Sequence, residues 1–251
     1  IVLSCHLDHQ RPGANDNASG CATILEVART LARLIADGKI ARPSRSIRFV
    51  WPCEVECTLA LFASEPAMRA RFKAVIHMDM VGGGPVTKSI FHVGRGPASL
   101  PSFVSDVGQR FGTFMNIESQ MYAEGTGGKY PMVSGEGGKE PQLGDLAEFS
   151  MGSDHELYQE ASWKIPAIYM NDWPDRYIHT NFDVPANIDP NKLQRAAFIS
   201  AASVLFLASM KSDDLPALEA TIQSTLPPRC ARRQRPRTTL TLRAADVCTT
   251  Q

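Results

Sequence analysis

Apolar residues recur at three- and four-residue steps in two long segments of the chain. In residues 18–37 the recurring positions are Ile24, Val27, Ala28, Leu31, Leu34 and Ile35, and Gly38 follows as a stop signal. In residues 191–210 the apolar face is formed by Leu193, Ala196, Ala197, Ile199, Ser200 and Val204. Because this spacing is that of a helix with one buried face, the sequence predicts a helix over each segment.

Short apolar runs elsewhere in the chain predict strands. They cover residues 1–3, 46–51, 74–80, 89–93 and 166–170. Weaker helical patterns cover residues 59–72, with a break at Pro66, and residues 100–111 and 154–161. Strands that alternate with helices indicate a mainly parallel sheet covered on both faces, so we expect an α/β fold.

Two regions lack any hydrophobic period. Residues 125–144 are rich in Gly and Pro, which predicts a long loop of the kind that is often functional or mobile. After Asp213 the chain carries Pro and many Arg without apolar spacing, so we expect one domain over residues 1–212 and a disordered tail over residues 213–251. The chain starts inside the first predicted strand, and we therefore expect the domain to be incomplete at its N-terminal end.

Composition limits the kinds of partner. Lys plus Arg and Asp plus Glu both number 26, so charge does not indicate a nucleic-acid partner. No apolar run has the length of a membrane span, and the first residues lack the pattern of a signal peptide. The six cysteines form no C-x-x-C pair, which argues against a thiolate metal site, and the sequence leaves open whether any pair is oxidised.

Acidic residues and histidines follow the predicted strands at the points where the strands end. In a parallel sheet these ends lie at one edge, so the side chains could converge there. Imidazole and carboxylate groups together form a ligand set that suits Zn²⁺. The residues concerned are His6, Asp16, Glu54, Glu56, Asp79 and His179.

The same residues carry a resemblance to a known family. The order is H-L-D, G-A-N-D-N-A-S-G, an acidic segment after F-V-W, H-M-D-M, G-S-D-H and R-Y-I-H-T. Over residues 6–208 the chain resembles the zinc exopeptidases of metallopeptidase family twenty-eight, the relatives of leucyl aminopeptidase, glutamate carboxypeptidase and glutaminyl cyclase. The resemblance implies the zinc-exopeptidase (phosphorylase/hydrolase-like) fold, a three-layer α/β/α sandwich with a mainly parallel mixed sheet, and a secreted or periplasmic protein.

The resemblance also implies a metal site. His6, Asp79 and a bridging Asp16 would hold one zinc ion, and Asp16, a glutamate and His179 would hold a second. Two metal ions bridged by a carboxylate can activate a water and stabilise the oxyanion formed when an amide carbonyl is attacked. Asp8 would fix the tautomer of the His6 imidazole.

The acidic segment departs from the family. Most members carry two adjacent glutamates there, a general base and then a metal ligand, whereas W-P-C-E-V-E-C-T separates Glu54 and Glu56 by Val55. Glu54 occupies the position of the general base, and Val55 occupies the position of the metal-binding glutamate. Glu56 could replace the ligand only if the backbone bulges, because alternate residues of an extended segment point the same way. Otherwise the second zinc ion is weakly held or the site has one zinc ion.

Further residues are candidates for the substrate pocket. Ser153, Asp154 and His155 match the family's S-D-H motif, and a role at the pocket or behind the metal ligands competes with helix capping by Asp154. Trp173 and Tyr177 flank His179 and could form a pocket wall.

Three histidines are expected outside the metal site. His77 fits a buried core position, and His9 and His92 fit loop and surface positions.

The function that these residues indicate is metal-dependent hydrolysis of a terminal peptide bond, by an aminopeptidase in particular. Two alternatives stay open: a glutaminyl-cyclase-like cyclotransferase with one zinc ion, and a non-catalytic domain of the same fold. The expected partner is a peptide substrate, and the oligomeric state is not readable.

Overall fold

Five strands form one sheet in the order β2-β1-β3-β5-β4. The structure is a computed structural model, and it describes residues 1–10, 12–130 and 140–224. The strands are β1 (Val2–Ser4), β2 (Arg48–Val50), β3 (Val75–Asp79), β4 (Ile90–Gly94) and β5 (Ala167–Trp173). Neighbouring strands are parallel except β4, which runs antiparallel to β5. The mainly parallel mixed sheet predicted from the sequence is confirmed.

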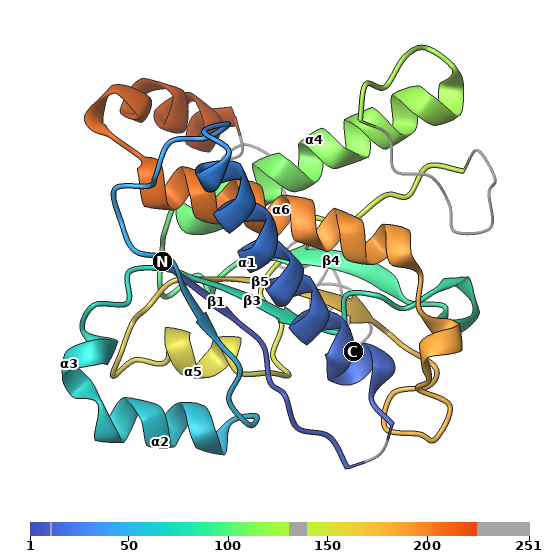
Figure 1. Cartoon of the computed structure of the whole chain (residues 1–251), viewed down its shortest axis with the longest axis horizontal. Helices are drawn as coiled ribbons and strands as arrows, with labels where there is room; N and C mark the ends of the chain where they lie inside the picture. The colour runs from blue at the N-terminus through green and yellow to red at the C-terminus, as the bar shows by residue number, and fades with distance from the viewer. Residues whose placement is uncertain (11, 131–139, 225–251) are drawn as a thin grey trace, which may run out of the picture. The chain divides into compact units, whose positions relative to one another are not determined.

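Helices cover both faces of this sheet (Figure 1). On one face lie α1 (Gly20–Ala36), α4 (Val104–Glu124) and α6 (Pro190–Ser209). On the other lie α2 (Glu56–Ser64), α3 (Pro66–Arg69) and α5 (His155–Gln159). The three-layer α/β/α arrangement is therefore also as expected, and the break at Pro66 separates α2 from α3.

The continuous apolar runs of the sequence are the central strands. Every residue of β1 and β3 is buried, because layers of helices cover both sides. Beneath the sheet, Phe62 of α2 packs edge-on against Phe72 and against Tyr158 of α5. A cluster of buried residues fixes this layer to the strands: Val2, Phe62, Phe72, Val75, Tyr158, Ile165 and Ala167.

Two elements are longer than the sequence predicts. α4 continues to Glu124, where Gly125 adopts a positive φ of 72°, instead of ending at residue 111. Beyond that point its buried face includes Gly112 and Ser119. Neither is a large apolar residue, so the hydrophobic pattern of the helix is interrupted there. β5 continues past residue 170 because the buried polar residue Asp172 still pairs with β4.

The chain divides into two units, with the boundary between Met210 and Lys211. The described part of the second unit contains a short turn of helix at Ser212–Asp214 and helical residues 215–224. This corrects the expectation of a disordered tail for residues 213–224, and residues 225–251 lie outside the described part, as do residues 131–139 of the predicted long loop. No helix of the described residues has the length and apolar character needed to cross a membrane.

Candidate metal centre

Two groups of candidate metal ligands meet at the carboxyl edge of the sheet. The first group consists of His6, Glu54 and Asp79, and the second group of His9, Asp16 and His179. In each group one ligand atom from every residue lies within 4.8 Å of the others. Asp16 also touches the first group, so the two groups form one continuous site.

Asp16 directs its two carboxylate oxygens to different groups. Its Oδ1 lies 3.2 Å from Nε2 of His6, which is itself 3.2 Å from Oδ1 of Asp79. Its Oδ2 lies 3.1 Å from Nε2 of His179 and 3.3 Å from Nε2 of His9. This is the arrangement that a carboxylate needs in order to bridge two metal ions.

Sheet topology places the first group. β1 and β3 are adjacent parallel strands, with Ser4 opposite His77. His6 lies two residues beyond the end of β1, and Asp79 is the last residue of β3. Parallel strands end at the same edge, so the imidazole and the carboxylate meet there without a long loop.

Hydrogen bonds to the backbone hold Asp16 in place. The backbone amides of Asn15 and Asp16 donate to the two oxygens of Asp183, at 2.7 and 2.9 Å. The side-chain oxygen of Asn17 accepts from the backbone amide of Met80, at 3.2 Å. The loop that begins η1 (Ala14–Ser19) is thus attached both to the end of β3 and to the loop that follows β5.

The charges of the site favour a bound cation. Asp16 and Asp79 are each 4 % exposed, and together with Glu54 they bring three carboxyl groups to one small volume. Burial alone would lower the pKa of His6, but its contacts with Asp16 and Asp79 outweigh burial and raise the pKa to about 11. The carboxylates therefore strongly favour positive charge at this position.

The spacing and chemistry of the donors fit zinc. Zinc bonds of about 2.0–2.1 Å in tetrahedral geometry place two donor atoms roughly 3.3 Å apart. The four imidazole–carboxylate distances in the site are 3.1 to 3.3 Å. Imidazole nitrogens and carboxylate oxygens are both common zinc donors, so the residues present are compatible with the metal that the sequence predicts.

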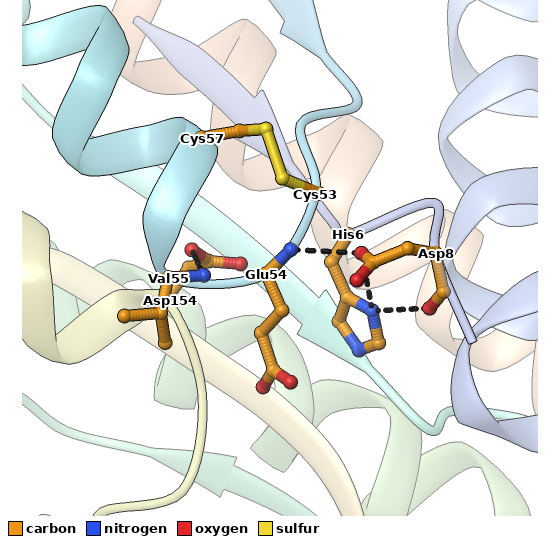
Figure 2. Close-up of a disulfide and its surroundings, with 7 residues drawn as sticks. All are labelled: His6, Asp8, Cys53, Glu54, Val55, Cys57 and Asp154. Atoms are coloured by element: carbon orange, nitrogen blue, oxygen red, sulfur yellow. Dashed lines mark hydrogen bonds and ion pairs between the residues drawn. A yellow bond between two sulfur atoms is a disulfide. The ribbon is translucent and has the colours of Figure 1, made fainter. Parts of the chain in front are cut away.

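The segment that carries Glu54 is held from three directions (Figure 2). The amide of Glu54 donates to Oδ1 of Asp8, at 2.8 Å, and the amide of Val55 donates to Oδ1 of Asp154, also at 2.8 Å. A disulfide joins Cys53 to Cys57 across the same segment. These contacts fix the backbone that presents the Glu54 side chain to the first group.

Glu54 has the electrostatic character of a proton acceptor near neutral pH. Burial raises the pKa of its carboxyl to about 7; the charge of His6 opposes this shift, and the nearby Asp79 and Asp154 add to it. A catalytic base works best when its pKa lies near the working pH. The position and pKa of Glu54 are therefore compatible with those of a general base at the first group.

Asp8 supports His6 differently from the sequence prediction. Nδ1 of His6 lies 3.1 Å from the backbone carbonyl oxygen of Asp8 and 3.5 Å from its carboxylate. The carbonyl is therefore the group that sets the tautomer of His6, while the carboxylate accepts the Glu54 amide.

The prediction that Glu56 could serve as a metal ligand needs correction. Glu56 is the first residue of α2 and is exposed, and among the described residues it belongs to neither group of candidate ligands. The backbone turns at Val55, with a φ of 56°, and enters the helix instead of bulging toward the metal centre. The position expected for the second glutamate therefore holds no acidic side chain that reaches the site.

The predicted pocket residues Ser153, Asp154 and His155 are buried behind the site and do not line an open surface. Ser153 Oγ lies 2.8 Å from Nε2 of His77, and the His155 ring stacks on Tyr169 at 3.8 Å. Asp154 makes no side-chain capping bond at α5 and instead accepts the Val55 amide. These three residues therefore support the metal centre through buried contacts and are not positioned to contact a substrate.

Trp173 is the last residue of β5, and Tyr177 lies on the loop that leads from β5 to His179. Trp173 is 53 % exposed, and Tyr177 is half-buried with its ring 5.8 Å from that of Phe182. Their role as a pocket wall stays a prediction. The expected surface residue His92 contacts the Trp173 carbonyl, at 2.8 Å.

His9 is the site residue that sequence reasoning missed. It was expected in a loop outside the site, whereas its Nε2 lies beside Asp16 and its side chain is only 15 % exposed. The signal in the sequence is the spacing of His6 and His9, two imidazoles three residues apart in front of a carboxylate.

Comparisons with known proteins agree with this architecture. The family model described as "Peptidase family M28" matches residues 1–204. A search of curated proteins returned no match.

Solved structures with the same fold include several peptidases. A zinc aminopeptidase from Bacillus subtilis is 20 % identical with a TM-score of 0.59, and the alignment covers 84 % of this chain and 46 % of that protein. The LapA aminopeptidase of Legionella pneumophila is 21 % identical with a TM-score of 0.57, covering 84 % and 52 %. A glutaminyl cyclase from Macrostomum lignano is 15 % identical with a TM-score of 0.54, covering 84 % and 68 %. The chain thus spans about half the length of the two aminopeptidases.

Proposed function

Because the chain belongs to peptidase family M28, we propose that it is a zinc-dependent exopeptidase, and in particular an aminopeptidase. The observation that carries the proposal is the carboxylate of Asp16, which faces His6 with one oxygen and His179 with the other. Such a centre, with a candidate base beside it, suits the attack of water on a peptide carbonyl. The substrate would be a peptide with a free terminus.

In this proposal Glu54 moves the proton. A bound pair of zinc ions would supply Lewis acidity, making the attacking water more acidic and stabilising negative charge on the peptide carbonyl oxygen. A carboxylate oxygen of Glu54 accepts a proton from that water and returns it to the leaving amine. Asp8 accepts a hydrogen bond from the Glu54 amide and Asp154 accepts one from the Val55 amide, and these two bonds hold the backbone in place during both transfers.

We further propose a secreted or periplasmic location. The disulfide between Cys53 and Cys57 supports it, because structural disulfides persist in oxidising compartments and are rare in the cytosol.

Metal analysis and product analysis together test the proposed activity. The full chain should take up zinc, release free amino acids from the ends of short peptides, and lose that activity in a chelator. Unblocked and N-terminally acetylated peptides of the same sequence separate an aminopeptidase from a carboxypeptidase, because only the first enzyme is stopped by the acetyl group. A zinc-loaded protein that cleaves neither peptide would contradict the proposal.

One observation favours a second candidate, a glutaminyl-cyclase-like cyclotransferase with one zinc ion. Val55 stands where the family motif has its second glutamate. The glutamate ligand of the second zinc ion is therefore missing. Release of ammonia from a peptide that begins with glutamine, with no release of free amino acid, would favour the cyclotransferase. Zinc uptake without either reaction would favour a non-catalytic domain.

A further inference from the structure

We propose that His9 is a metal ligand, and that it replaces the glutamate that the family motif would place at Val55. The proposal deepens the proposed function and rests on it, because it assigns the second zinc site of the same centre. The second group would then hold its ion with His9, Asp16 and His179.

The geometry of Asp16 is the first argument. Nε2 of His9 and Nε2 of His179 approach the same oxygen, Oδ2 of Asp16, at 3.3 and 3.1 Å. The two rings lie 5.7 Å apart and are tilted by 41°. All three donor atoms lie within 4.8 Å of one another, on the side of Asp16 that faces away from His6. Donors about 3.3 Å apart match two edges of a zinc tetrahedron.

Gly13 provides a second, independent argument, because it lies close to both His9 and Asp16. A Cβ atom at Gly13 would lie 2.9 Å from Cγ of His9 and 2.0 Å from the carbonyl oxygen of Asp16. Only a residue without a side chain leaves both groups in place. The absence of a side chain at Gly13 therefore allows His9 to lie close to the segment that carries Asp16.

The chemistry of the substitution explains why the site tolerates Val55. A glutamate ligand would supply one oxygen and one negative charge, whereas His9 supplies one neutral nitrogen. The second group then has two imidazoles and one carboxylate oxygen, a donor set that suits zinc better than it suits magnesium or manganese. The third ligand of this group would therefore come from the segment after β1, where His9 lies, and not from the segment after β2, where the family motif has its glutamate.

Zinc content of the full-length chain tests the proposal without relying on activity. The wild type should retain two zinc equivalents after dialysis, and His9→Ala and His179→Ala should each retain one. His92→Ala is the matched control, since His92 lies outside both groups and contacts Asp145 and the Trp173 carbonyl. His9→Ala with as much zinc as the wild type would overturn the assignment.

X-ray absorption at the zinc edge gives a second readout that needs no variant and so does not depend on whether a variant folds. The wild type should show three imidazole nitrogens shared by two zinc ions, from His6, His9 and His179. Only two imidazoles would overturn the role of His9 and leave the proposed function standing. A wild-type chain that binds no zinc at all would instead contradict the proposed function.

Discussion

The backbone amide of Glu54 donates a hydrogen bond of 2.8 Å to the carboxylate of Asp8. Glu54 follows β2 and Asp8 follows β1, so this bond joins the loop of the candidate base to the loop of the candidate ligands. The carbonyl of the same Asp8 lies 3.1 Å from Nδ1 of His6. Asp8 therefore fixes the base and a ligand relative to each other (Figure 2).

Removing the Asp8 carboxylate should slow the reaction more than it weakens the fold. Asp8→Ala frees the Glu54 amide, and because supporting residues of this kind contribute roughly 10- to 100-fold, we expect kcat to fall by that factor. Asp8→Asn keeps an oxygen acceptor and should retain most of the rate. Steady-state kinetics on zinc-loaded protein measures both, and equal rates for Asp8→Ala and the wild type would exclude this role.

Glu54→Gln should abolish turnover while zinc stays bound. Glutamine has nearly the same shape but accepts no proton, and loss of a general base costs about 100- to 10,000-fold in rate. Glu56→Gln is the matched control, since Glu56 is exposed two residues away and should have no effect. Full activity in Glu54→Gln, measured on protein with wild-type zinc content, is the result that rules out Glu54 as the base.

The disulfide between Cys53 and Cys57 should stabilise the fold modestly. Closing so short a ring removes chain entropy worth about 2 kcal/mol in the unfolded state, so Cys53→Ser with Cys57→Ser should lower the free energy of unfolding by about that amount. Denaturant unfolding with and without a reductant measures it. The reductant should shift the wild type and leave the double variant unchanged, because Cys5 and Cys21, the other two cysteines among the described residues, are free thiols. A wild type insensitive to the reductant would contradict the prediction.

Substituting Asp16 should weaken zinc binding more than substituting Asp79. Asp16→Ala removes a donor from both groups and should weaken both sites, whereas Asp79→Ala removes a donor from the first group alone. Isothermal titration calorimetry with zinc, which measures the number and affinity of the sites, distinguishes the two variants. If Asp16→Ala kept one site at wild-type affinity, Asp16 would not bridge.

The sequence predicts the sites that depend on sheet topology. His6 and Asp79 could be placed together because both lie at the ends of parallel strands, and that edge is set by the alternation of strands and helices. The length of helix α4 could not be predicted, because Gly112 and Ser119 interrupt its apolar pattern on the buried side.

Features that depend on the course of a loop could not be predicted. The position of His9 depends on close packing at Gly13, where a Cβ atom would lie 2.9 Å from Cγ of His9, and no residue period reports such a contact. The role of Asp154 is similar: its motif indicated a cap or a pocket, while the structure turns its carboxylate to Val55 at the start of α2. Whether Cys53 and Cys57 are joined likewise depends on their separation in space.

If both proposed zinc ions bind, the shared carboxylate of Asp16 would also make their two sites thermodynamically dependent on each other. An ion held at Oδ1 of Asp16 would draw charge from the carboxylate and so change the donor strength of Oδ2, the oxygen that faces His179. Whatever factor the first ion applies to the affinity for the second, the second applies to the first, because coupling between sites is reciprocal. Loading of such a two-ion centre would therefore be a linked equilibrium, which a single dissociation constant would not describe.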